Sequence, residues 1–126
     1  MPLLQFDTTC SPTDAEKRAV TDAVTDLYAE EMATSTDHVA VVIREHPDAN
    51  LSLGRAVDGP RCFLSADVRE GRSFERRRAF ALAAMELVSE RFGVPEPNLK
   101  VAFTEHPGGD LMGVDRVGGE GTADQG

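Results

Sequence analysis

The sequence has few of the residues that stabilise small secreted proteins or bind nucleic acids. Its two cysteines, Cys10 and Cys62, form no C-x-x-C pair. Their wide spacing favours free thiols in a reducing compartment over a disulfide or a zinc site. Lysine occurs twice, and 22 acidic against 13 basic residues give a net charge of −9. Such a surface repels phosphates, which argues against a nucleic-acid partner.

Long apolar segments are also missing. No run approaches the roughly 18 residues that cross a membrane, and no signal peptide precedes the first apolar segment. We therefore expect a cytoplasmic protein with no membrane partner. Apolar residues still make up 40% of the chain, which is enough for one small core. The acidic, lysine-poor composition resembles that of salt-adapted proteins, because high salt screens self-repulsion.

The chain contains an internal repeat of 60 residues. At this shift, Glu45-His46-Pro47 falls on Glu105-His106-Pro107, and the register holds without a gap back to Leu3 and Phe63. Identical pairs recur along it, among them Leu4 with Leu64, Asp7 with Asp67 and Leu27 with Leu87. Self-similarity at a fixed spacing indicates a duplicated structural unit.

Each unit has the pattern of a strand, a helix and a second strand. Apolar, β-branched segments predict strands at residues 3–8, 38–45, 61–68 and 99–105. Helical spacing predicts one helix from the cap Thr13, with Glu16 completing a capping box, to about Met32. The second helix is predicted from the cap Ser73 to Phe92.

Two such units predict an α/β (α+β) fold made of tandem β-α-β repeats. Right-handed crossovers place the four main strands in one sheet with both helices on one face. We expect one domain over residues 1–117, with repeats at about 2–59 and 61–115. Residues 51–59 are predicted to form a hairpin or a linker, and residues 118–126 a flexible tail.

Pro2 is a candidate catalytic residue because it directly follows Met1. Methionine is normally removed before a small residue, which would leave a secondary amine able to accept a proton or form an iminium. The alternative is that Pro2 only opens a strand, where its missing N–H does no harm. In the repeat register it corresponds to Cys62, which we interpret as a buried small residue rather than a nucleophile.

The loop Arg69-Glu70-Gly71-Arg72, just before the second helix, is a candidate carboxylate site. Guanidinium groups match the geometry of a carboxylate, and a helix N-terminus also favours anions. The alternative is that Arg69 and Arg72 are only solvent-exposed charges. The nearby run of three arginines at residues 76–78 is interpreted as a surface or subunit contact.

His46 and His106 invite a metal interpretation, since each follows a glutamate. A strand end inherited by duplication is the simpler interpretation, because no third ligand has suitable spacing. We therefore expect no metal and no cofactor.

These features together resemble the tautomerase superfamily. They are the proline after Met1, the β-α-β unit doubled at 60 residues, and the Arg69-Glu70-Gly71-Arg72-Ser73 loop. The doubled chain is similar to the cis-3-chloroacrylic acid dehalogenase and malonate semialdehyde decarboxylase groups, whereas 4-oxalocrotonate tautomerase has a single unit. The resemblance covers about residues 2–115. It implies a tautomerase/MIF-like fold and a homotrimer whose strands complete sheets across subunits.

The resemblance also implies roles for individual residues. Pro2 would be the general base in tautomerisation or the general acid in hydration. Arg69 and Arg72 would bind and polarise the substrate carboxylate. Other positions depart from the family pattern: Tyr28 stands where the cis-dehalogenases have an assisting histidine, and Asp115 is the only acid near their water-activating glutamate. Leu51 or Leu111 falls near the aromatic wall of the simple tautomerase.

The predicted function is a cofactor-free tautomerase acting on a small unsaturated 2-keto or 2-hydroxy carboxylate. Neutral Pro2 would move the proton, and nearby arginines would lower the pKa of its amine. One alternative is a hydratase, dehalogenase or decarboxylase acting on a three-carbon acid, with protonated Pro2 assisted by Asp115 or Tyr28. The other is a non-catalytic trimeric binding protein.

Overall fold

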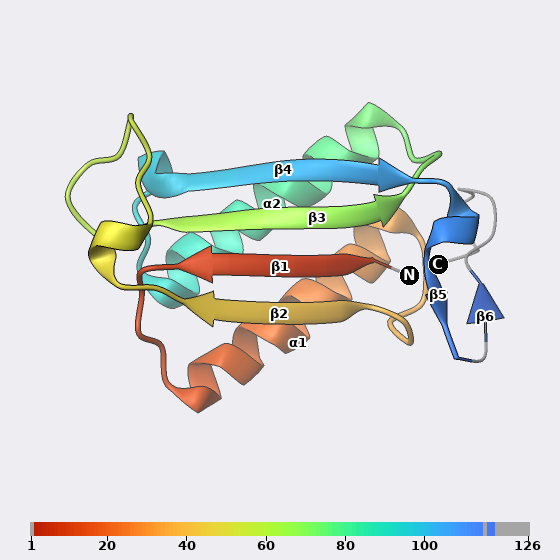
Figure 1. The fold of residues 1–126 in the computed structure, drawn as a ribbon, viewed down its shortest axis with the longest axis horizontal. Helices are drawn as coiled ribbons and strands as arrows, with labels where there is room; N and C mark the ends of the chain where they lie inside the picture. The colour runs from red at the N-terminus through yellow and green to blue at the C-terminus, as the bar shows by residue number, and fades with distance from the viewer. Residues whose placement is uncertain (1, 115, 118–126) are drawn as a thin grey trace.

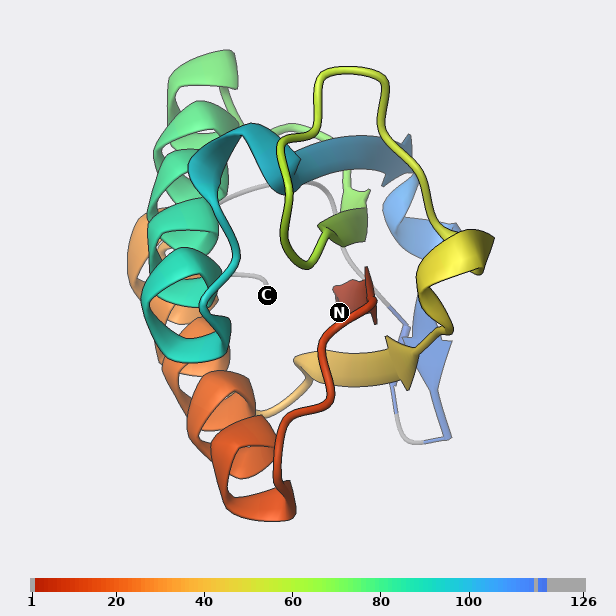
Figure 2. The same ribbon diagram turned by 90° about the vertical axis from the view of Figure 1, so that its left-hand side faces the viewer.

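Each repeat folds as a β-α-β unit, as the sequence predicts. The computed structural model describes residues 2–114 and 116–117. The first unit contains β1 (Leu3–Thr8), α1 (Asp14–Met32) and β2 (Ala40–Glu45), and the second contains β3 (Cys62–Arg69), α2 (Phe74–Phe92) and β4 (Leu99–His106). Both helices lie on one face of a four-stranded sheet (Figures 1 and 2). The predicted fold class is therefore confirmed.

The strand order of the sheet is β2-β1-β3-β4. Each repeat supplies one parallel pair, and the repeats join through the antiparallel pair of β1 with β3. In that pair Leu3 lies opposite Asp67, and Thr8 lies opposite Cys62. The start of β1 therefore lies at the sheet end where β3 and β4 finish, as Figure 1 shows.

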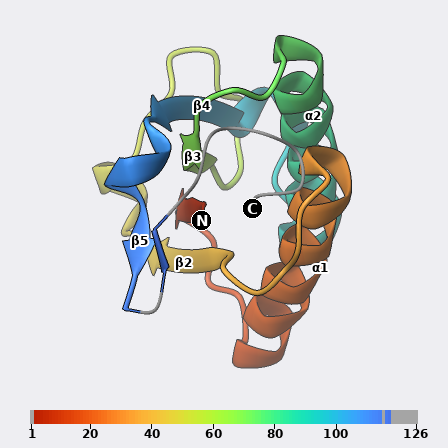
Figure 3. The same ribbon diagram turned by 90° about the vertical axis from the view of Figure 1, so that its right-hand side faces the viewer.

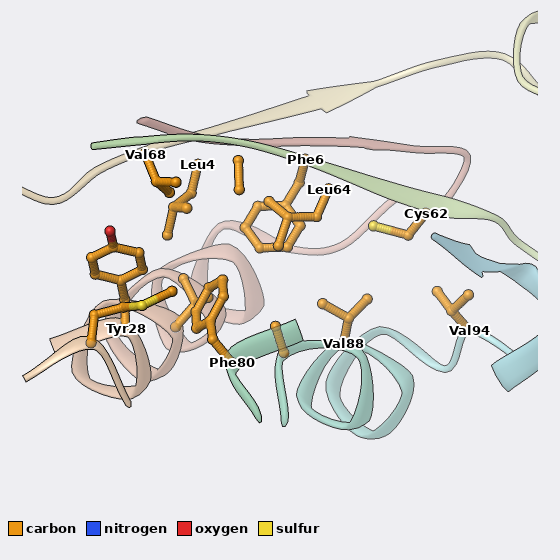
Figure 4. Close-up of a cluster of buried hydrophobic side chains, with 13 residues drawn as sticks. Leu4, Phe6, Tyr28, Cys62, Leu64, Val68, Phe80, Val88 and Val94 are labelled. Atoms are coloured by element: carbon orange, nitrogen blue, oxygen red, sulfur yellow. The ribbon is translucent and has the colours of Figure 1, made fainter. Parts of the chain in front are cut away.

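The core lies between the sheet and the two helices. Alternation along β1 buries Leu4, Phe6 and Thr8 against the helices and turns the intervening residues to the opposite face. Phe80 of α2 is fully buried and packs edge-on against Tyr28 of α1, with ring centroids 5.2 Å apart. Figure 4 shows this pair beneath the apolar side chains of the sheet.

The predicted helix caps are present. Thr13 and Glu16 form the reciprocal capping box, and the Ser73 side chain accepts a hydrogen bond from the backbone N–H of Arg76. Such caps satisfy amide groups that have no partner inside the helix. Among the helices of the described residues, none is both long and apolar enough to span a membrane.

The segment between the repeats is a linker, with no strand at residues 51–59. It contains the 3-10 turn η1 (Asp48–Asn50), and the buried side chain of Asn98 binds its backbone instead of a strand partner. Asn98 Oδ1 accepts from the Val57 N–H at 2.8 Å, and Asn98 Nδ2 donates to the carbonyls of Val57 and Pro60. Because Asn98 belongs to the second repeat, the sequence of the linker does not predict these hydrogen bonds.

The chain beyond β4 contains a short hairpin that the periodicity does not predict. The 3-10 turns η2 (Glu96–Asn98) and η3 (Gly108–Asp110) flank β4, and β5 (Met112–Gly113) pairs with β6 (Arg116–Val117). Strands of two residues are too short to produce an alternating pattern. Asp115 and the predicted tail at residues 118–126 lie outside the described residues.

Candidate functional site

Pro2 is held at the start of β1. Its carbonyl accepts a hydrogen bond from the Ala40 N–H at 3.0 Å, which extends the pairing of β1 with β2. The residue is buried, on the same alternation as Leu4. The antiparallel register continued by one residue places Pro2 across from Val68, next to Arg69. The chain therefore brings two of the predicted site residues to one end of the sheet.

Arg69 and Arg72 lie in a fixed loop. Arg69 ends β3 and is 2% exposed, and the following Glu70 N–H donates to the His106 carbonyl at 2.8 Å. Gly71 has a φ of 110°, a backbone conformation that side chains other than glycine rarely adopt. The Arg72 guanidinium donates to the Met32 carbonyl at the end of α1, from Nε at 3.4 Å and from Nη2 at 3.3 Å.

Arg72 therefore caps the end of α1 in addition to its predicted role in the site. The last turn of α1 has no basic residue of its own, so its terminal carbonyls lack a local positive partner. Arg72 binds the Met32 carbonyl, and Arg76 Nη1 donates to the Glu31 carbonyl at 2.9 Å. Arginines of the second repeat thus complete the helix of the first and fix where α1 ends relative to the loop.

Tyr28 joins this cluster from α1. Burial raises the pKa of the Tyr28 phenol, although the charges of Arg72 and Arg69 oppose the shift. The phenol therefore keeps its proton at neutral pH and can donate a hydrogen bond. Its hydroxyl points toward the sheet in Figure 4. The structure thus brings Tyr28 close to Arg69 and Arg72, from which the sequence separates it by more than 40 positions.

Leu111 comes from the C-terminal segment at the same sheet end. It follows η3, is half-buried, and its N–H donates to the Gly108 carbonyl at 3.2 Å. Figures 1 and 3 both show η3 and β5 beside the start of β1. An apolar side chain in this segment fits a wall of the predicted site. Asp115, the other residue predicted here, lies outside the described residues.

The opposite end of the sheet provides an internal comparison. At the 60-residue shift, Cys62 is equivalent to Pro2, and Val88 is equivalent to Tyr28. Thr9 and Pro12 are equivalent to Arg69 and Arg72. Burial raises the pKa of the Cys62 thiol to about 12, so it carries no thiolate at neutral pH and is a poor nucleophile. Pro2 and the buried arginines Arg69 and Arg72 therefore lie at one end of the sheet, and their repeat equivalents at the other end carry no charge.

Sequence reasoning missed two Asp–His pairs on the face of the sheet that the helices leave uncovered. His46 Nε2 lies 2.7 Å from Asp7 Oδ1, and His106 Nε2 lies 2.8 Å from Asp67 Oδ1. A carboxylate only accepts hydrogen bonds, so Nε2 is the donor in both. The signal was available, because all four residues recur at the 60-residue shift and alternation turns the aspartates to this face.

The glutamate that precedes each histidine forms an ion pair with a basic residue of a helix. Lys17 Nζ of α1 lies 3.1 Å from Glu45 Oε1, and Arg77 Nη1 of α2 lies 3.2 Å from Glu105 Oε1. The repeated Glu-His-Pro segment therefore ties each outer strand to a helix through its glutamate and to an inner strand through its histidine. Within residues 2–114 and 116–117, no three His, Cys, Asp or Glu side chains are placed to share a metal ion.

Comparison with known proteins agrees with this geometry. The family model described as tautomerase enzyme matches residues 2–57. A fused 4-OT described as a wild-type symmetric trimer has 22% sequence identity and a TM-score of 0.80, over 90% of this chain and 92% of its own. The resemblance to the tautomerase superfamily is confirmed. The first repeat matches the tautomerase family by sequence, and nearly the whole chain has the tautomerase fold.

Other chains with the tautomerase fold carry different activities in their descriptions. A member of the cis-3-chloroacrylic acid dehalogenase family has 18% identity and a TM-score of 0.80, over 91% of this chain and 82% of its own. A malonate semialdehyde decarboxylase has 21% identity and a TM-score of 0.75, over 90% of this chain and 92% of its own. No curated protein matches by sequence. At these identities the likeness shows the fold alone, so the reaction depends on the residues of the site.

Proposed function

We propose that the chain is a cofactor-free tautomerase that moves a proton within a small unsaturated 2-keto or 2-hydroxy carboxylate. The observation that supports it is the coincidence of Pro2, Arg69 and Arg72 at one sheet end, whereas Cys62, Thr9 and Pro12 occupy the equivalent positions at the other end. Removal of Met1 turns the Pro2 nitrogen into a secondary amine with a lone pair. With a 2-hydroxy substrate the neutral amine takes the proton of the enol hydroxyl, and with a 2-keto substrate it takes one from the carbon beside the keto group. The protonated amine then returns the proton to a carbon further along the conjugated system.

The arginines support this chemistry in two ways. Their positive charges disfavour protonation of the Pro2 amine, so a usable fraction of neutral base is present near pH 7. They also stabilise the negative charge that develops as the substrate becomes a dienolate. Both effects are stronger in a site from which water is excluded, and Arg69 and Arg72 are 2% and 8% exposed. Tyr28 adds a neutral donor, and Leu111 an apolar wall.

The proposed assembly is a homotrimer. Among the described residues, both helices lie on one face of the sheet and no helix packs on the other (Figures 2 and 3), and a neighbour of the same fold is described as a symmetric trimer. Packing of three such faces would bury the Asp–His pairs and bring a second subunit close to the end that carries Pro2.

A second candidate is a lyase that hydrates, dehalogenates or decarboxylates a three-carbon acid. The protonated phenol of Tyr28 favours it, because it supplies an acid beside the arginines at neutral pH. This candidate requires protonated Pro2, whereas the tautomerase requires the neutral amine. The two reactions therefore have opposite dependences on pH.

A pH–rate profile tests the proposal. We expect turnover of phenylenolpyruvate or 2-hydroxymuconate, with kcat/KM rising as pH increases through the Pro2 pKa and then levelling. A rate that instead falls over this range, with haloacrylate or propiolate-type acids as the better substrates, supports the lyase. Absence of turnover with all of these acids, in protein shown by mass to lack Met1, contradicts both.

A further inference from the structure

We propose that Asp67 and His106 form a positioning pair for the candidate site, holding the Arg69–Arg72 loop in register with the strand that carries Pro2. This inference rests on the proposed function for its catalytic consequence. Its structural part, that the pair controls the start of the loop, stands on the geometry of the sheet end alone.

Asp67 connects three strands at this end. Its Oδ1 accepts from His106 Nε2 of β4 at 2.8 Å, and its Oδ2 accepts from Gln5 Nε2 of β1 at 3.2 Å. Asp67 itself lies on β3, opposite Leu3 and therefore one residue from the partner position of Pro2. A single carboxylate thus joins the strand that begins with Pro2 to the two strands that flank the arginine loop.

His106 binds the loop through its backbone as well. It lies opposite Arg69 in the parallel ladder of β3 and β4, and its carbonyl accepts from the Glu70 N–H at 2.8 Å. It is also the last residue of its strand and is followed by Pro107, which has no N–H to continue the ladder. The bond to Asp67 is therefore the side-chain contact that holds this strand end against the loop.

Small displacements of such a loop have large consequences for a carboxylate ligand. Bidentate recognition depends on the direction of both guanidinium groups, and a misplacement of about 1 Å costs up to 100-fold in rate. Loss of the pair lets the end of β4 move away from Glu70. Because a carboxylate is bound in the ground state and in the transition state, the loss raises KM more than it lowers kcat.

The repeat supplies an internal control, the Asp7–His46 pair at the opposite end of the sheet, although here the Arg44 guanidinium also binds Asp7, from Nε at 2.8 Å and from Nη2 at 3.0 Å. Its histidine and aspartate side chains are 30% and 21% exposed, against 30% and 27% for His106 and Asp67. The His46 N–H donates to the Thr8 carbonyl, and no arginine loop adjoins this end. Because Asp7 keeps its bonds to Arg44 when His46 is replaced, the two substitutions are compared by their effects on Glu70 exchange and on KM, and a difference in either one reports the position of the pair relative to the arginine loop.

The experiment compares His106→Leu, His106→Gln and His46→Leu in the full-length protein. Amide hydrogen exchange of Glu70 measures loop position without any need for activity. We expect His106→Leu to accelerate this exchange about 10-fold and to raise KM about 10-fold with less than a threefold change in kcat. Gln, whose amide nitrogen replaces the Nε2 donor, should restore both values to within about threefold of wild type. His46→Leu should leave both unchanged, with a smaller loss of Tm than His106→Leu because Arg44 still binds Asp7.

The outcomes separate this inference from the proposed function. Unchanged Glu70 exchange in His106→Leu overturns the positioning role, whatever the activity. Accelerated exchange with an unchanged KM, or a KM raised equally by His46→Leu, overturns its catalytic part. If the wild-type protein turns over none of the keto acids but Glu70 exchange responds as expected, the proposed function fails and the structural role of the pair stands.

Discussion

Replacement of Pro2 by alanine is expected to lower kcat for the best keto-acid substrate by about 10²–10⁴-fold, the range that one general base contributes. Alanine is also small enough for Met1 to be removed, so the variant keeps a terminal amine. It loses the rigid ring that fixes the nitrogen at the start of β1, where the Pro2 carbonyl is bound by the Ala40 N–H. Steady-state kinetics at several pH values measure the effect.

Cys62→Ala is the control for this prediction, because Cys62 is the repeat equivalent of Pro2 at the opposite end of the sheet. Removal of its buried thiol should cost some stability but leave kcat within about twofold of wild type. A Pro2→Ala protein that retains most of its activity would contradict the general-base role. Loss of activity in both variants would point instead to damage to the sheet.

Replacement of Phe80 by alanine is expected to destabilise the fold by about 3–5 kcal/mol, the usual cost of deleting a fully buried aromatic ring. Phe80 is 0% exposed and contacts Tyr28 and Phe103 edge-on, at 5.2 and 6.4 Å between ring centroids. The cavity left behind would lie between the two repeats, so their packing should weaken together. Urea unfolding followed by circular dichroism measures the change in the free energy of unfolding.

Phe74→Ala on the same helix is the matched control. Phe74 is 62% exposed, so loss of its ring should change the free energy of unfolding by less than about 0.5 kcal/mol. Equal effects of the two substitutions would show that the helix does not pack as described. The pair also tests whether α2 keeps its register on the sheet, because a rotated helix would exchange the burial of these residues.

The parts of the fold that sequence predicts are those set by local pattern and by the duplication. The capping box of Thr13 with Glu16 and the helical spacing of apolar residues predict α1 to its last residue. The strands differ by at most two residues from their predicted bounds, with β2 beginning at Ala40 rather than His38. Duplication then predicts the same β-α-β topology in both halves of the chain, but not the antiparallel pairing of β1 with β3 that joins them.

The contacts that define the site are non-local, and local pattern carries little information about them. Arg72 resembles a free carboxylate ligand in sequence, yet its guanidinium binds the Met32 carbonyl of the other repeat. The bond from Gln5 to Asp67 joins strands 62 positions apart, and it depends on the antiparallel register of β1 with β3. Alternation along a strand predicts on which face of the sheet each side chain lies, but not which residue of another strand it pairs with.

The proposed function depends on the residues in which the two repeats differ, not on those that they share. Residues that the duplication keeps, such as Asp7 with Asp67 and His46 with His106, form equivalent structural pairs. Residues that it does not keep, Pro2 and the arginines of the loop, gather at one sheet end. A duplicated fold with one altered end can therefore hold a site without changing the contacts that stabilise it.

Titration of the Pro2 nitrogen by ¹⁵N NMR in proline-labelled protein tests the central claim most directly. The account predicts a titrating secondary amine whose pKa lies well below that of a free prolyl terminus, because two guanidinium groups oppose its protonation. Conversion of both arginines to glutamine should raise that pKa again. An amide resonance that does not titrate would contradict the role of Pro2 as the general base. So would an amine whose pKa is ordinary and does not change when both arginines are replaced.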